Sequence, residues 1–183
     1  MNAPKKVVFS ACRMLWLTLA GCNVLVSRPT STYVTASGAL AARQWTGRVH
    51  PFDAKSAERL LVFDALYVAR VTDSQRTWFR FWPTGQVASG GVFSDRGEIE
   101  AAHGNDLRSA HLGRYKVEGA SITIELVVRA EGDTYFVHYS GVVDHDGSLL
   151  LRGENTGLAR RDGRLPDRYR LTRVGPMKTP AGW

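Results

Sequence analysis

The sequence predicts an all-β protein, and two features of the chain beyond residue 60 carry that prediction. Several short runs alternate apolar and polar residues with a period of two, which is typical of strands that cover a core with one face and meet water with the other. Turn signals rich in Gly, Pro, Asp and Ser separate these runs, as in an antiparallel barrel or sandwich. No stretch of comparable length keeps a helical period. We therefore expect an antiparallel meander of about eight strands with one or two short helices.

The first residues of the chain have the composition of a secretory signal. A basic segment, residues 1–13, precedes a short apolar segment, residues 14–20, and small residues follow. The alternative is an uncleaved membrane span over residues 7–26, which has the required length of about 20 residues. Arg13 would then lie well inside the span, where an Arg costs about 2.5–3.5 kcal/mol on insertion scales. A cleaved signal does not carry this cost.

The end of this segment, Leu19-Ala20-Gly21-Cys22, resembles the lipobox of bacterial lipoproteins at all four positions. The resemblance implies cleavage before Cys22, a diacylglycerol on its thiol and an acyl chain on the new amino terminus. Two or more chains anchor a protein stably at a bilayer. Asn23, rather than Asp, follows the Cys, and the resemblance then favours the outer membrane of a bacterial cell envelope, with the domain in the periplasm or at the cell surface.

Removal of the signal would change both the charge and the thiols of the chain. The formal net charge is +7, and Lys5, Lys6 and Arg13 supply three of those charges, so a chain that begins at Cys22 would carry +4. Cys12 would leave with the signal and Cys22 would carry lipid. The mature domain would then have neither a disulfide nor a thiol nucleophile, and its core alone would stabilise it.

Four regions are expected along the chain. Residues 1–21 form the signal peptide. Residues 22–55 mix Ser, Thr, Ala and Gly without lasting periodicity and are predicted to be a tether, with one early strand at residues 33–35. The β-barrel domain is expected over residues 56–175 and a C-terminal tail over residues 176–183.

Recognisable turns separate the expected strands. Pro83 fixes φ for the first position of one turn, and Gly85 can take the positive φ that a bulged hairpin requires. Short helices are expected around residues 54–59 and over residues 94–103, with Ser94 as the cap of the second. The expected strands cover residues 63–71, 76–82, 86–93, 113–117, 122–129, 134–144, 148–154 and 168–174.

Alternation also assigns faces within these strands. In the longest runs the apolar residues share one face, expected to be the core, and the polar residues share the other, expected to meet water. The core-facing set is Tyr115, Val117, Ile122, Ile124, Leu126 and Val128, and the water-facing set is Arg114, Lys116, Glu118, Thr123, Glu125 and Arg129.

Three stretches, WFRFWPTGQV, GRYKVEGASITIEL and GVVDHDGSLLLRG, resemble the meander of small lipocalin-like lipoproteins. The resemblance covers about residues 60–155 and implies an up-and-down barrel. The interior of such a barrel is either filled by side chains or holds a small apolar ligand.

An aromatic group stands out within the second expected strand. Alternation places Trp78 and Trp82 on one face with Arg80 between them, where the guanidinium can stack on the indoles. Phe79 and Phe81 share the other face. Since both faces are aromatic, we expect one to belong to the core and the other to be covered by a loop, a partner or membrane. The residues considered for binding a ligand or a partner are Trp78, Arg80, Trp82, Tyr115, Tyr139 and His138.

His138 has two placements in a strand. It faces out of the barrel if Tyr135, Val137 and Tyr139 face in, and it lines the interior if the register shifts by one residue. Either way, a lone His in a strand is more often structural than catalytic.

Few motifs point to metal binding or catalysis. His103 and His111 are eight residues apart, which suits neither a helix face nor a compact zinc site. Residues 144–147, DHDG, supply too few oxygen ligands for a calcium loop and match a hairpin turn instead. The chain contains no nucleophile elbow, Gly-rich phosphate loop or paired-carboxylate motif. We therefore expect a protein that is not an enzyme and has no metal or cofactor.

Three functions remain open from the sequence. The first is a lipid-anchored envelope protein whose barrel binds a small apolar ligand or an envelope partner. The second is a structural or assembly lipoprotein with a packed barrel that docks through an aromatic or Arg-rich surface. The Arg-rich segment 160–173 can touch acidic lipids or envelope polymers, or it can be a solvated strand. A hydrolase with a site around His103, His111 or His138 is a third, weaker alternative. Nucleic acid is not an expected partner of an exported domain.

Overall fold

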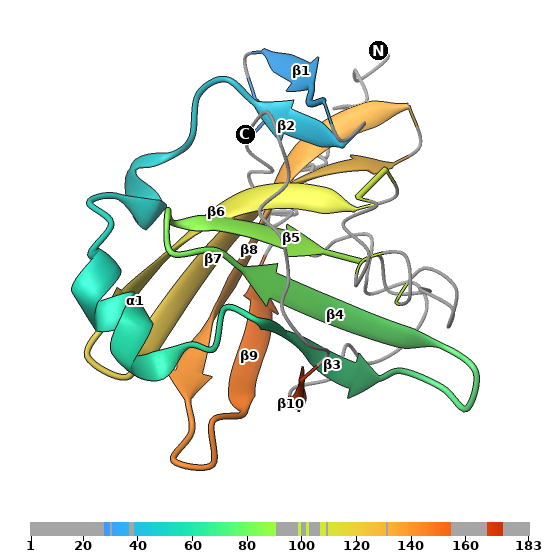
Figure 1. The fold of residues 1–183 in the computed structure, drawn as a ribbon. Coiled ribbons are helices and arrows are strands. Elements are labelled where there is room, and N and C mark those ends of the chain that lie inside the picture. The colour runs from blue at the N-terminus through green and yellow to red at the C-terminus, as the bar shows by residue number, and fades with distance from the viewer. Residues whose placement is uncertain are drawn as a thin grey trace, which may run out of the picture.

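The computed structural model of the chain describes residues 28–29, 31–36, 39–90, 99, 102, 107–108, 110–130, 132–154 and 168–173. Strands dominate these ranges and form one curled sheet (Figure 1). The elements are β1 Thr32–Val34, β2 Leu40–Ala42, the 3-10 helix η1 Gly47–Val49, α1 Ala54–Leu60, β3 Ala65–Arg70, β4 Arg76–Phe81, β5 Gln86–Ser89, β6 His111–Glu118, β7 Ser121–Ala130, β8 Asp133–Val143, β9 Leu149–Glu154 and β10 Arg168–Arg173.

Strands β3 to β10 form an up-and-down barrel. Each strand pairs with its neighbour in sequence, and β10 pairs with β3 to complete the ring, with Leu171 opposite Tyr67. Every one of these pairings is antiparallel. The all-β, lipocalin-like fold class is confirmed, and the eight strands of the ring correspond to the eight that the sequence predicts. The closing strand, 168–173, is the one expected at residues 168–174.

Glycines at positive φ form the hairpin turns that the sequence marks. Gly85, between β4 and β5, has φ +82°, and Gly147, between β8 and β9, has φ +77°. Residues 144–147 form a turn in which the Gly147 amide donates to the Asp144 carbonyl oxygen at 2.9 Å. The prediction that the DHDG segment is a hairpin turn is confirmed.

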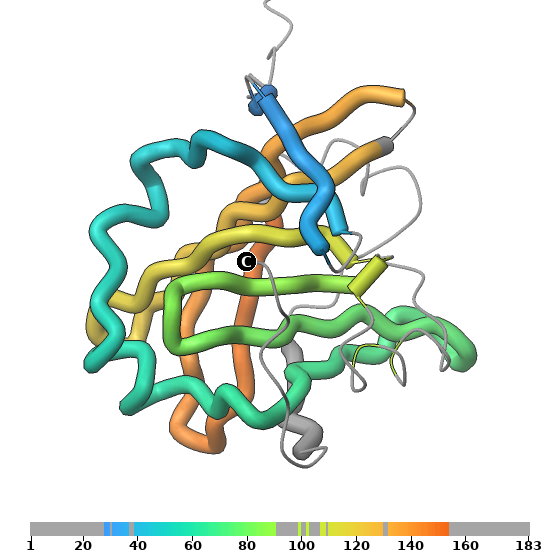
Figure 2. The backbone as a smooth tube through the Cα atoms, turned by 45° about the horizontal axis from the view of Figure 1, so that its top comes forward, coloured from blue at the N-terminus to red at the C-terminus, as the bar shows by residue number. Residues whose placement is uncertain are grey.

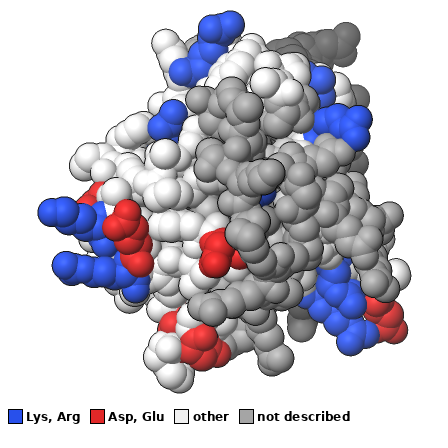
Figure 3. All heavy atoms as spheres, in the orientation of Figure 1, with Lys and Arg blue, Asp and Glu red and all other residues white. Residues whose placement is uncertain are grey.

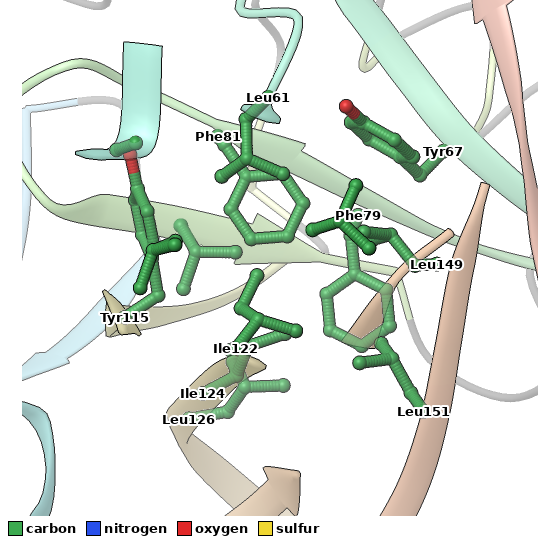
Figure 4. Close-up of a cluster of buried hydrophobic side chains, with 14 of the residues drawn as sticks. Leu61, Tyr67, Phe79, Phe81, Tyr115, Ile122, Ile124, Leu126, Leu149 and Leu151 are labelled. Atoms are coloured by element: carbon green, nitrogen blue, oxygen red, sulfur yellow. The ribbon is translucent and has the colours of Figure 1, made fainter. Parts of the chain in front are cut away.

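Aromatic and branched side chains fill the interior of the barrel (Figure 4). The ring of Phe81 contacts those of Tyr67, Phe79 and Tyr115, with centroids 5.4, 6.2 and 5.0 Å away. Phe79 also meets Tyr139 edge-on at 5.3 Å. Aliphatic side chains from β7 and β9 complete this cluster, namely Ile122, Ile124, Leu126, Leu149 and Leu151. The inward face predicted from the alternation is confirmed.

Helix α1 covers one end of the barrel (Figure 1). Its N-cap is Asp53, whose carboxylate accepts hydrogen bonds from the Lys55 amide at 3.0 Å and the Ser56 hydroxyl at 2.6 Å. Ala57 and Leu61 pack against the interior cluster. The short helix expected near residues 54–59 is therefore present, and it closes the interior from this end.

The segment before α1 belongs to the folded unit rather than to a tether. Strand β2 pairs with the start of β6, Leu40 opposite His111, and β1 pairs with β2. Figure 2 shows this hairpin lying outside the ring. Leu40 and Trp45 pack on Val127 and Phe136 of the barrel's outer face. The boundary expected at residue 56 therefore differs from the structure, because the small side chains that resembled linker composition here permit close packing.

Several sequence predictions fall outside the described residues. The signal peptide 1–21, the lipobox with Cys22, His103 and the tail 176–183 all lie there, and so does most of the expected helix 94–103. Within the described part of the chain, no helix has both the length and the apolar character needed to cross a bilayer.

Candidate functional site

The aromatic–arginine face of β4 is buried by the chain itself. Trp78, Arg80 and Trp82 share one face, as predicted, and the Arg80 guanidinium lies 4.6 Å from the Trp82 ring centroid. All three are nearly inaccessible, with 1%, 0% and 3% of their surface exposed. Burial lowers the pKa of Arg80 to about 10. Residues that follow β5 pack on this face, namely Ile99, Ala102, Leu107 and Ala110. The face is thus covered by a connection, and these three residues are not placed to meet a ligand or partner.

Two further candidate residues, Tyr115 and Tyr139, lie inside the barrel. The Tyr115 hydroxyl donates to the Trp82 carbonyl oxygen at 2.7 Å, and burial raises the pKa of Tyr115. Burial also raises the pKa of Tyr139 to about 12. Both side chains are therefore neutral members of the core.

Replacing Tyr115 with Phe is expected to lower the free energy of unfolding by about 0.5–1.5 kcal/mol. The change removes one buried hydrogen bond, but the Trp82 carbonyl keeps the Gly85 amide as a donor at 3.1 Å. Urea unfolding monitored by circular dichroism measures the difference. Tyr33→Phe is the control, since 37% of Tyr33 is exposed. An equal effect of both changes would contradict the proposed role of the buried hydroxyl.

His138 faces out of the barrel and is nevertheless buried. It lies opposite Glu125 across β7 and β8, and only 3% of its surface is exposed. Its neighbour Tyr139 packs into the interior, so the outward placement is correct. The His138 Nε2 atom is 3.2 Å from Glu125 Oε2. Since an ionised carboxylate only accepts hydrogen bonds, Nε2 carries the donated proton.

Glu125 connects this histidine to the segment before α1. The Thr46 amide donates to Glu125 Oε1 at 2.8 Å, and the Thr46 hydroxyl donates to Oε2. Burial alone would raise the pKa of Glu125, but the hydrogen bonds from His138 and Thr46 outweigh burial and lower it. These hydrogen bonds hold residues 43–49 on the barrel, and Thr46, Glu125 and His138 are together called the clamp below. The sequence does not reveal this contact, because alternation places Glu125 toward water and the composition of residues 22–55 predicts a tether around Thr46.

A row of polar residues crosses the outer face beside the clamp. Gln86, Arg114, Glu125 and His138 lie opposite one another in register across β5, β6, β7 and β8. Alternation put Arg114 and Glu125 on this face. Nothing in the alternation indicated that β2 and η1 would cover one end of the row.

Next to the row, a groove opens between the β1–β2 hairpin and strands β5 and β6. Its volume is about 300 Å³. The polar and aromatic residues that line it are Tyr33, Arg43, Trp45, Gln86 and Arg114. Figure 3 shows Lys and Arg atoms, and no described Asp or Glu, in the upper part of the face, where β1 and β2 lie.

No metal centre is formed by the described residues, since no three of their His, Cys, Asp or Glu side chains come together. His111 begins β6 opposite Ser89 and Leu40, and burial lowers its pKa. Comparison of the chain with protein-family models, with curated proteins and with solved structures found no match.

Proposed function

We propose that the protein is a non-catalytic, lipid-anchored lipoprotein of the bacterial cell envelope, with a packed barrel that serves as a scaffold and an outer surface that makes the contacts. The observation that carries the proposal is the filled interior. Phe81 has three aromatic neighbours at centroid distances of 5.0–6.2 Å, and α1 covers one end.

A filled interior argues against a carrier of apolar molecules. Ligand pockets usually have volumes of about 300–1,000 Å³ and are largely preformed. A ligand in this barrel would have to displace side chains such as Phe79 and Phe81, which are fully buried. Each such side chain contributes about 1.5–3 kcal/mol through burial. A ligand that entered the interior would therefore first have to offset the loss of this burial.

The proposed lipid anchor is supported by the lipobox resemblance of residues 19–22 and by the short segment between Cys22 and β1. The first strand among the described residues begins at Thr32, ten residues after Cys22. A chain of that length spans at most roughly 35 Å. A barrel anchored through Cys22 would therefore stay close to the membrane, with the β1–β2 hairpin nearest the anchor in sequence.

Native mass spectrometry of the full-length protein, purified gently from membranes, tests both parts of the proposal. We expect a mass gain equal to a diacylglycerol plus an acyl chain, with the signal removed, and no apolar molecule retained by the folded domain. The gain should be absent from Cys22→Ser.

Cys12→Ser is the matched control, because Cys12 lies before the expected cleavage point and should leave lipidation unchanged. An unmodified wild-type chain would refute the anchor. An apolar molecule bound non-covalently to both wild type and Cys22→Ser would instead support the carrier.

A further inference from the structure

Two arginines line the groove, and neither has an ion-pair partner among the described residues. Each guanidinium lies over an aromatic ring instead. Arg43 Cζ is 5.5 Å from the centroid of Tyr33, and Arg114 Cζ is 5.9 Å from that of Trp45. Stacking of this kind orients a planar guanidinium while its N–H donors stay available at the edge. Both arginines are thus held in place with unused donors.

Within the described residues, no carboxylate forms an ion pair with either arginine of the groove. No carboxylate lines it. The acid closest in register is Glu125, opposite Arg114, but its oxygens accept hydrogen bonds from Thr46 and His138. Since the clamp occupies Glu125, Arg114 remains free to pair with an anion from outside.

The other lining groups suit a small polar molecule. Gln86 uses its side-chain oxygen to accept a hydrogen bond from Thr84, which leaves its amide NH₂ group as a donor. Guanidinium groups pair with carboxylates and phosphates through two parallel hydrogen bonds. The volume of about 300 Å³ fits a single sugar or a small organic acid.

We propose that this groove binds an oxyanion, a carboxylate or a phosphate, carried on a polar molecule of sugar size. Arg43 and Arg114 supply the charge-assisted hydrogen bonds, and Gln86 contributes a neutral donor. The site rests on the part of the proposed function that assigns binding to the outer surface of the barrel. It does not depend on the lipid anchor.

Isothermal titration calorimetry of the full chain with glucuronate, glucose 6-phosphate and glucose tests the site. We expect at least one of the two charged sugars to bind, and glucose to show no detectable binding. Arg43→Gln and Arg114→Gln should each raise the Kd at least tenfold. Arg59→Gln is the control, because Arg59 is an exposed cation on α1, outside the groove.

Three results would overturn the site: no binding of either charged sugar at about 10 mM, roughly tenfold above a millimolar Kd, equal binding of glucose, or an equal loss in Arg59→Gln. Circular dichroism of each variant confirms that it is folded, and two separate groove variants keep the test decisive if one is not. A negative titration would leave the mass-spectrometric test of the anchor and of the empty interior unaffected, so the two failures are distinguishable.

Discussion

Replacing Glu125 with Ala is expected to lower the free energy of unfolding by about 3–5 kcal/mol, because three hydrogen-bond donors would lose their shared acceptor. The change would leave the Thr46 amide, the Thr46 hydroxyl and His138 Nε2 without their acceptor beneath the β1–β2 segment. Each buried donor left unsatisfied costs about 1–3 kcal/mol. Since Glu125 is fully buried, water cannot replace the carboxylate without loosening that segment.

Urea unfolding at neutral pH measures the loss, and amide hydrogen exchange at residues 39–50 locates it. These residues should exchange faster in the variant than the strands of the ring. Glu118→Ala is the control, because Glu118 is 69% exposed and its ion pair with Lys116, at 3.0 Å, lies at the surface. An exposed pair of this kind contributes about 1 kcal/mol at most. Equal destabilisation by the two changes would mean that the clamp does not hold the segment.

The clamp also predicts how stability changes with pH. The pKa of Glu125 is lowered in the folded protein from its usual value of 4.5, so the unfolded chain binds its proton more readily. Its contribution to stability is therefore complete above pH 4.5 and is lost as the pH falls through the folded pKa. Glu125→Gln removes this titration while preserving side-chain size. The stability difference between wild type and Glu125→Gln should shrink on acidification below pH 4.5, whereas a constant difference would exclude Glu125 as the titrating group.

Local sequence signals predicted the barrel well. Strands β6 and β7 contain runs of alternating residues, and glycines such as Gly85 and Gly147 mark where the chain reverses. A period of two and a turn residue are properties of adjacent positions, so a single sequence contains them. The face that holds Ile122 and Ile124 followed from the same signal.

The sequence did not reveal which faces of the strands are covered by distant segments of the chain. Alternation tells which side chains share a face, but it does not tell whether another segment packs on that face. Glu125 was assigned to the outer face and His138 was left with two placements, whereas the buried Glu125 accepts hydrogen bonds from Thr46, which is 79 residues before it. Trp78 is likewise buried by residues near Leu107. β2 spans three residues, too few for a periodic signal, so the covering segment read as a tether.

A second large effect is expected where two strands of the barrel approach closely. Gly141 lies in β8 opposite Leu151 of β9. A Cβ added at Gly141 would lie 1.8 Å from the Leu150 carbonyl oxygen and 2.8 Å from its carbon. Both are backbone atoms, so no rotamer change relieves the overlap and the two strands must separate. We expect Gly141→Ala to lower the free energy of unfolding by about 3 kcal/mol, at the upper end of overpacking effects.

Gly47→Ala is the matched control for this substitution, since nothing lies within 4 Å of a Cβ added at Gly47. Where the backbone is compatible, Gly→Ala stabilises by about 0.4–1 kcal/mol because it restricts the unfolded chain. The two identical chemical changes should therefore shift the urea midpoint in opposite directions. The direction of the midpoint shift distinguishes the close contact between β8 and β9 from a general effect of losing glycine. A neutral effect of Gly141→Ala would contradict the close approach of β8 and β9 at the pair of Gly141 with Leu151. The barrel would then have to close more loosely on that side.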